Sequence, residues 1–134
     1  MSDEVTGGRY KGIGEVNMKT ILIVEDTELN IDLLTQLLEE NYNLLVARDG
    51  AEGVLVTERS KPDLILMDIS LPVMDGYEAA RQIRQRFKSL PIIGLSANAM
   101  KSDSEKAIAA GCSDYLTKPI DEDALINKLQ EYLG

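Results

Sequence analysis

Leu64-Ile65-Leu66-Met67-Asp68, four consecutive apolar residues followed by an aspartate, is the stretch that decides the predicted fold. Apolar residues at consecutive positions are typical of a strand covered on both faces, as in a parallel sheet, whereas a half-exposed strand alternates. The run at 64–67 therefore predicts a buried strand. Similar runs predict four more strands, at residues 21–24, 44–47, 92–95 and, more weakly, 114–117.

Longer amphipathic stretches separate these strands. Apolar residues at helical spacing are clearest in three groups: Leu29, Leu33, Leu34, Leu37 and Leu38; Ala79, Ala80, Ile83 and Phe87; Leu125, Ile126, Leu129 and Leu133. A helix is also expected at Gly50–Ser60, although Gly53 lowers its intrinsic propensity. Asp121 is placed to cap the last helix, and Gly111 to end the fourth. Five strands alternating with five helices predict a three-layer, doubly wound α/β fold.

The composition excludes several classes of function. The 134 residues include 14 Lys and Arg against 23 Asp and Glu, a formal charge of −9, which disfavours binding to nucleic acid or anionic lipid. The absence of histidine excludes His-based metal sites, Ser-His triads and a phosphohistidine within the chain. Chemistry must therefore use carboxylates, hydroxyls or lysine.

Domain organisation and location follow from the same inspection. Residues 1–17 contain four glycines and no periodicity, so they are expected to form a disordered leader or an addition, with one domain at 18–134. The single cysteine, Cys112, cannot form an internal disulfide, and no apolar run is long enough to insert into a membrane. These features predict a cytoplasmic protein.

Polar residues follow the predicted strands in a pattern. In order along the chain, the strands are followed by Glu25 and Asp26, Asp68, Ser96, and Lys118. Because parallel strands end at one edge of a sheet, where ligands bind in such folds, these side chains are expected to meet. Clustered carboxylates repel one another unless a cation neutralises them, and oxygen ligands alone favour Mg²⁺.

This arrangement suits phosphoryl transfer. Lys118 and the hydroxyl of Ser96 could hold phosphoryl oxygens, while Asp68 on the central strand is placed to attack. Singly, each residue has a structural explanation: an acidic pair caps a helix, an aspartate caps a turn, and a lysine before proline is solvated. Their occurrence at four strand ends favours the functional interpretation.

Four segments carry a family resemblance that spans residues 19–133. They are Ile21-Leu22-Ile23-Val24-Glu25-Asp26, Pro62 to Gly76 (PDLILMDISLPVMDG), Leu95-Ser96-Ala97, and Tyr115-Leu116-Thr117-Lys118-Pro119. In order and spacing they resemble the receiver domains of two-component response regulators, which have a flavodoxin-like fold. Asn30, Ala97-Asn98-Ala99-Met100 and Gly111-Cys112 look most like single-domain cell-cycle regulators and the receivers of hybrid kinases.

The resemblance implies that Asp68 accepts a phosphoryl group from a histidine kinase or a histidine phosphotransfer protein. Asp26 would bind Mg²⁺ directly and Glu25 through water, with Asp68 and the backbone carbonyl of Ser70 completing the site. Such a protein catalyses only its own phosphorylation and dephosphorylation.

Further roles follow from the same resemblance. Lys118 would contact the phosphoryl group, and its peptide bond to Pro119 would be cis. Ser96 and Tyr115 would be the switch pair that changes a surface for a downstream protein. Since no output domain follows the last predicted helix, signalling is expected to occur by protein contact or onward phosphoryl transfer.

Two positions depart from the common pattern. Glu25 stands where many receivers carry aspartate, which we expect to tune metal binding. Ser70 is short where a longer amide or acid could orient an attacking water, so slow self-dephosphorylation is expected.

Three other functions fit the sequence less well. A flavin protein of similar fold would need a hydroxyl- and glycine-rich phosphate loop, where this chain has Glu25-Asp26-Thr27-Glu28. A haloacid-dehalogenase-type phosphatase would need a second aspartate at the position of Ser70. A pseudo-receiver, which binds partners without being phosphorylated, would lack a site residue, and none is missing.

Overall fold

Five strands and five helices alternate along the part of the chain that the structure, a computed structural model, describes: residues 18–71, 74–97 and 101–134. The predicted leader at 1–17 lies outside these residues, as do Asn98, Ala99 and Met100 of the motif noted above. The elements are β1 (Thr20–Val24), α1 (Glu28–Leu38), β2 (Asn43–Ala47), α2 (Gly50–Ser60), β3 (Leu64–Asp68), α3 (Gly76–Arg86), β4 (Ile92–Ser96), α4 (Lys101–Ala110), β5 (Asp114–Thr117) and α5 (Glu122–Leu133).

The strands form one parallel sheet in the order β2-β1-β3-β4-β5. The predicted doubly wound α/β fold is therefore confirmed, with β3 at the centre. Asp68, predicted to follow β3, is its last residue and pairs with Leu95 of β4. The central strand thus carries the aspartate to the carboxyl edge of the sheet.

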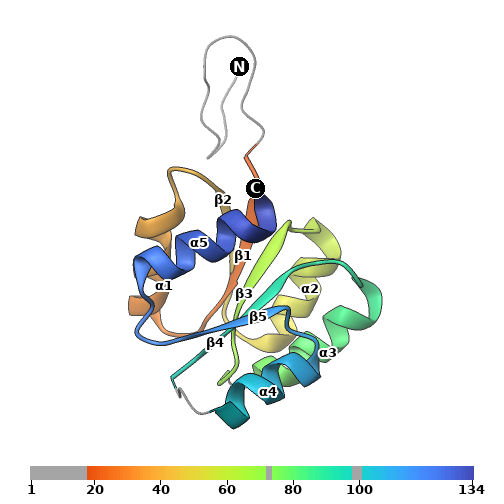
Figure 1. The fold of residues 1–134 in the computed structure, drawn as a ribbon. Coiled ribbons are helices and arrows are strands. Elements are labelled where there is room, and N and C mark those ends of the chain that lie inside the picture. Colours follow the sequence, from red (N-terminus) through yellow and green to blue (C-terminus); the bar gives the residue numbers. More distant parts are fainter. Residues whose placement is uncertain (1–17, 72–73, 98–100) are drawn as a thin grey trace.

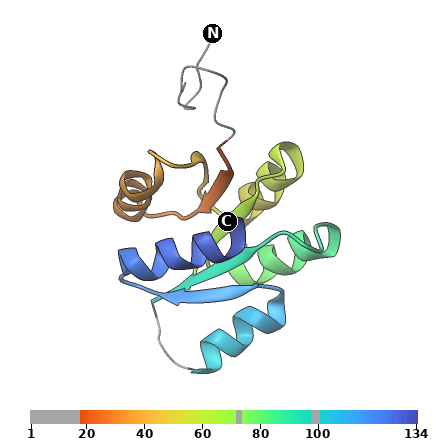
Figure 2. The same ribbon diagram turned by 45° about the horizontal axis from the view of Figure 1, so that its top comes forward.

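Helices cover both faces of the sheet, α1 and α5 on one and α2, α3 and α4 on the other (Figures 1 and 2). Successive residues of β3 point to opposite layers: Leu64 and Leu66 pack with α1 and α5, whereas Ile65 and Met67 pack with α2, α3 and α4. Burying each such side chain stabilises the fold by about 2 kcal/mol. This two-sided burial explains why the strand is apolar at every position.

Helix α2 forms despite Gly53, because that glycine lies where the helix approaches the sheet most closely. A Cβ there would lie 3.1 Å from both Cγ atoms of Val24. The buried hydroxyl of Thr57 donates to the Gly53 carbonyl at 2.7 Å, and Asp49 caps the helix by accepting from the Glu52 amide. Packing and capping together offset the low propensity of glycine.

At the amino edge of the sheet, polar groups are matched one to another. The Arg84 guanidinium donates to the carbonyls of Gly111 (2.9 Å) and Phe87 (2.8 Å) and to the Ser113 hydroxyl (3.2 Å). At the start of β5, Asp114 forms an ion pair with Lys128 of α5 at 3.1 Å. These bonds hold the ends of α3 and α4 to the starts of β4 and β5.

The two ends of the domain also lie at this amino edge, where β1 begins and α5 ends (Figure 1). Asp63, before β3, ties the edge together by accepting from the Thr20 amide at 2.7 Å. Among the described helices, none combines the length and apolar character needed to cross a membrane.

Candidate functional site

The carboxyl edge brings together the residues that the sequence places at the strand ends. Glu25 and Asp26 follow β1, and the Glu25 amide bonds to the Ala47 carbonyl at 2.9 Å, which extends the sheet. Lys118 follows β5, and its amide donates to the Ser96 carbonyl at 2.6 Å. Backbone pairing beyond the strand ends therefore fixes where each functional side chain starts.

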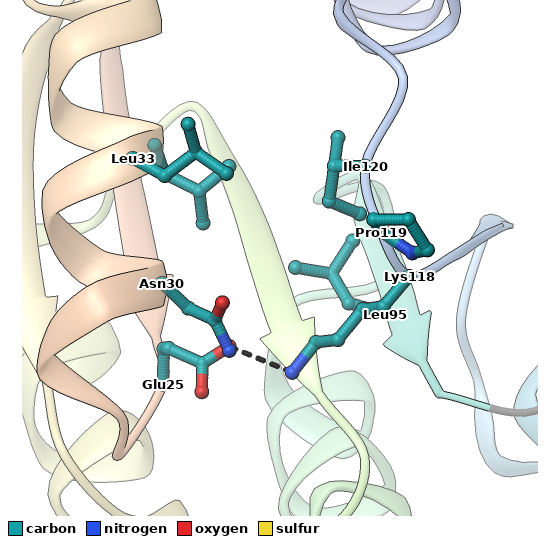
Figure 3. A pocket seen from close by; sticks show the side chains of 8 residues that line it. Glu25, Asn30, Leu33, Leu95, Lys118, Pro119 and Ile120 are labelled. Atoms are coloured by element: carbon teal, nitrogen blue, oxygen red, sulfur yellow. Dashed lines mark hydrogen bonds and ion pairs between the residues drawn. The ribbon is translucent and has the colours of Figure 1, made fainter.

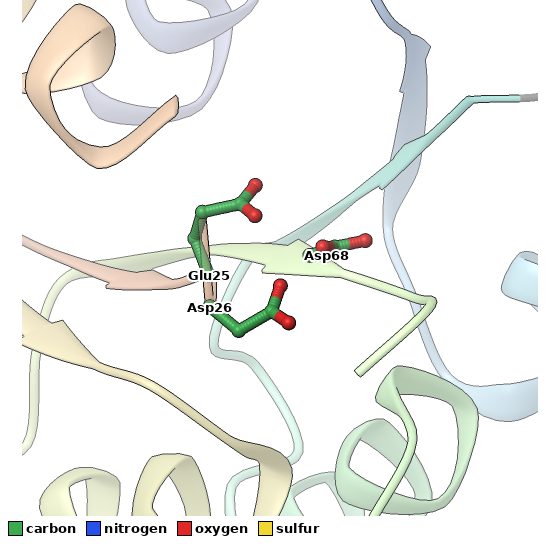
Figure 4. A group of neighbouring side chains, drawn as sticks. All are labelled: Glu25, Asp26 and Asp68. Carbon is green, nitrogen blue, oxygen red and sulfur yellow. The ribbon is translucent and has the colours of Figure 1, made fainter. Parts of the chain in front are cut away.

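Three carboxylates meet at this edge. One oxygen from each of Glu25, Asp26 and Asp68 lies within 4.8 Å of the others, and the three side chains converge on one space (Figure 4). Glu25 is fully buried and Asp68 is 4% exposed, whereas Asp26 faces solvent. The Ser70 amide donates to Asp68 Oδ1 at 3.0 Å, which orients that carboxylate.

Lys118 is the cation that reaches this cluster. Its Nζ lies 2.9 Å from Glu25 Oε2 (Figure 3). The same Nζ lies 3.3 Å from Asp68 Oδ2. The cis peptide bond between Lys118 and Pro119 that the resemblance implies is present. Within the part of the chain that the structure describes, one ammonium thus contacts two of these three carboxylates, which leaves an excess of negative charge.

The excess of negative charge affects the pKa values of Asp68 and Glu25 differently. Burial raises the pKa of Asp68 to about 6, and the charge of Glu25 adds to this, while the Ser70 amide and Lys118 oppose it. Burial acts the same way on Glu25, but the bond to Lys118 and its positive charge outweigh it and lower the pKa of Glu25. Glu25 and Lys118 therefore form a charged pair, and Asp68 is the carboxylate that lacks full compensation.

The donor set fits a hard divalent cation. The cluster offers carboxylate oxygens from a buried and an exposed position, and the open side at Asp26 leaves room for water ligands, which Mg²⁺ retains. Burial is the main reason that the pKa of Asp68 is raised, and a cation there would stabilise its charged form and offset the smaller contribution from Glu25. The Ser70 carbonyl as a further ligand stays a prediction.

The predicted switch pair lies on adjacent strands. Ser96 ends β4 and is 4% exposed, close to Asp68 across the sheet. Tyr115 lies on β5, opposite Gly94, and is half-buried against the hydrophobic core beneath α3 and α4. Both positions are suited to relay a change at Asp68 toward α4, although an inward turn of Tyr115 stays a prediction.

An apolar pocket beside the cluster was not foreseen from the sequence. It has a volume of about 50 Å³ and lies between α1 and the segment after β5, lined by Asn30, Leu33, Pro119 and Ile120 beside Glu25 and Lys118 (Figure 3). On the adjoining surface of α1, Leu29 is 75% exposed and Leu33 is 42% exposed. Their spacing had predicted only a buried helix face; two leucines one turn apart, just after the acidic pair, were the available signal.

Fold and site together define a doubly wound α/β protein with an acidic site at the carboxyl edge of its central strands. The chain belongs to the family of response regulator receiver domains, whose family model matches residues 21–130. It is 38% identical over 119 residues to the polar-differentiation response regulator DivK of Brucella anthropi, covering 87% of this chain and 97% of that protein. The predicted family is confirmed.

Solved structures agree with this assignment. The receiver domain of the sensor histidine kinase PA1611 of Pseudomonas aeruginosa, with magnesium in its active-site cleft, has a TM-score of 0.80 and 40% identity, covering 86% of this chain and 97% of that one. A complex of the Saccharomyces cerevisiae phosphotransfer protein Ypd1 with the Ssk1 receiver matches with a TM-score of 0.81 and 35% identity, covering 86% and 88%. The predicted likeness to both stand-alone regulators and kinase receivers is confirmed.

Proposed function

We propose that this receiver domain takes a phosphoryl group from a partner phosphohistidine onto Asp68, with Mg²⁺ as its cofactor. The observation that carries the proposal is the placement of Asp68, buried at the edge of the central strand and 3.3 Å from the Lys118 ammonium. An oxygen of the carboxylate attacks phosphorus, the phosphorus–nitrogen bond breaks, and its electron pair remains on the imidazole. The product is an acyl phosphate on Asp68.

The chain's own residues supply positioning and charge for this step. Asp26, Glu25 and the Ser70 carbonyl would hold Mg²⁺, which adds positive charge beside the phosphoryl oxygens. Lys118 would transfer its contact from the Asp68 oxygen to a phosphoryl oxygen, while Glu25 keeps its other bond. The Ser96 hydroxyl would donate to another phosphoryl oxygen, and Tyr115 would follow it inward.

The surface around the pocket suits the approach of a phosphohistidine donor. Exposed Leu29 and Leu33 lie on α1 next to Glu25 and Lys118, so a partner packing on them would place its histidine near Asp68. A histidine kinase and a histidine phosphotransfer protein both meet this requirement. The output would be a contact with a downstream protein or onward phosphoryl transfer, in the cytoplasm, from a domain spanning 18–134.

A pseudo-receiver that is not phosphorylated is the weaker candidate. Such a protein is expected to lack an acceptor, a metal ligand or the lysine, whereas this chain has all of them close together at one edge.

The test is incubation with Mg²⁺ and acetyl phosphate, followed by intact mass measurement. We expect one added phosphoryl group on the wild-type protein and none on Asp68→Asn. Asp63→Asn, an aspartate at the other end of the same strand, is the matched control and should be modified like the wild type. No modification of the wild type, or equal modification of Asp68→Asn, would rule out the proposed mechanism.

A further inference from the structure

Helix α2 approaches the segment that follows Asp68 without any side chain between them. A Cβ built on Gly50, the first residue of α2, would lie 2.1 Å from the Met74 carbonyl oxygen. Gly50 is buried, and its φ angle is not one that requires glycine, so the close approach is the structural reason for glycine at this position. The start of α2 therefore acts as a stop for the β3–α3 segment at Met74.

The same segment is fixed at its base by a second close approach. A Cβ on Gly76 would lie 2.3 Å from the Asp68 carbonyl oxygen, and the Gly76 amide donates to the Ile69 carbonyl at 3.3 Å. Gly76 thus lies against the backbone of Asp68, and Met74 lies against Gly50. Ser70, whose amide orients Asp68 Oδ1, lies between these two points.

We propose that Gly50 is a positioning residue for the magnesium site, acting through Met74 on the backbone of Ser70. This inference rests on the proposed function, because it assigns to Ser70 both a bond to Asp68 and a share of the metal. A methyl group at position 50 must displace the Met74 carbonyl oxygen by about 1.3 Å to reach an ordinary contact distance. Displacement of supporting groups on this scale weakens metal sites by about tenfold or more.

The β3–α3 segment, and not the helix, is the part that yields. Helix α2 is fixed against β1, where Gly53 meets the Val24 side chain, and is capped by Asp49. Met74, in contrast, is only partly buried, at the margin of the core beneath α2, α3 and α4. A new methyl group at position 50 is therefore transmitted toward Ser70.

The experiment compares Gly50→Ala with Gly53→Ala, a matched substitution on the same helix. The nearest atoms to the new methyl group at position 53, outside the helix's own backbone, are side-chain atoms of Val24. Mg²⁺ affinity is measured by following backbone amide resonances, including that of Ser70, and stability by thermal unfolding in EDTA. We expect Gly50→Ala to shift the Ser70 resonance without metal and to weaken Mg²⁺ binding about tenfold. Gly53→Ala should alter the unfolding temperature but leave Mg²⁺ affinity within about twofold of the wild type.

A second variant guards against a misfolded Gly50→Ala protein. Met74→Gly gives the segment freedom to turn its carbonyl away, so Gly50→Ala should weaken Mg²⁺ binding less in that background than in the wild type. Unchanged affinity in Gly50→Ala, or equal losses in Gly50→Ala and Gly53→Ala, would overturn the positioning role. Failure of the wild type to bind Mg²⁺ would instead contradict the proposed function, and the Ser70 resonance in EDTA would still report whether Gly50 sets the segment.

Discussion

The two edges of the sheet carry similar charged side chains but differ in how far those charges are paired. At the amino edge, the Arg84 guanidinium bonds to carbonyl and hydroxyl groups, and Asp114 pairs with Lys128. At the carboxyl edge, the Lys118 ammonium contacts two of the three clustered carboxylates, those of Glu25 and Asp68. Paired groups stabilise the fold, whereas the uncompensated negative charge at the carboxyl edge favours protonation of Asp68 or the binding of a cation. This excess of charge is what marks the carboxyl edge as the functional site.

The largest expected effect on stability comes from replacing a lysine by methionine at each edge and comparing the losses. Lys118→Met should lower the free energy of unfolding in EDTA by about 3 kcal/mol, because it leaves fully buried Glu25 without its partner. Lys128→Met should cost only about 0.5–1 kcal/mol, since its pair with Asp114 is partly exposed. Urea unfolding measures both, and equal losses would contradict the contrast.

The next largest expected effect is a gain in stability, on replacement of Asp68. Its pKa of about 6 in the folded protein exceeds its ordinary value of 3.8, so ionisation destabilises the fold increasingly as pH rises from about 4 to 6 and fully above that. Asp68→Asn should therefore be more stable than the wild type at pH 7 in EDTA, by about 2–3 kcal/mol at most.

Two conditions check this prediction. Near pH 4 the difference between Asp68→Asn and the wild type should largely vanish, because the wild-type carboxyl is then protonated in the folded protein. Added Mg²⁺ should stabilise the wild type more than the variant. A wild type that gains stability as pH rises from 4 to 7, relative to Asp68→Asn, would show that the sign is wrong.

Arg84→Met tests the amino edge by itself. Removing the guanidinium leaves the Gly111 and Phe87 carbonyls short of donors, which we expect to cost about 2 kcal/mol of stability. The amount of phosphoryl group accepted from acetyl phosphate, measured by intact mass below the unfolding temperature, should stay unchanged. A loss of acceptance would mean that the two edges are coupled.

The smallest effect concerns the lifetime of the phosphoryl group. The side chain of Ser70 is shorter than an amide or acid that could orient an attacking water, so we expect Ser70→Asn to shorten the half-life of the proposed acyl phosphate by about tenfold. Intact mass at timed intervals after removal of acetyl phosphate gives the half-life. A wild-type half-life of only seconds, or no change in Ser70→Asn, would contradict the role assigned to this position.

The sequence predicted well whatever depends on local pattern. All five strands and the doubtful α2 helix are present, because two-sided burial leaves a continuous apolar run and helix faces leave a periodic one. The gathering of Glu25, Asp26, Asp68 and Lys118 followed from parallel strands sharing an edge. These features need only the order of the strands.

What depends on distances between backbone segments could not be predicted. The Gly50–Met74 contact joins residues that no pattern relates, and the bond between Lys118 and Glu25 spans 93 positions in the chain. The pocket between α1 and the segment after β5 likewise required the packing of the layers. Such features arise from how the elements pack against one another, which local patterns do not encode.

The position of the two domain ends has a practical consequence. The start of β1 and the end of α5 both lie at the amino edge (Figure 1), whereas Asp68 ends β3 at the opposite edge of the sheet. The domain can therefore be inserted into a host protein, with the host chain entering and leaving on one side, away from Asp68. Fluorescent reporters or surface tethers attached there would not cover the proposed phosphorylation site, which makes this domain a suitable cassette for engineered signalling circuits.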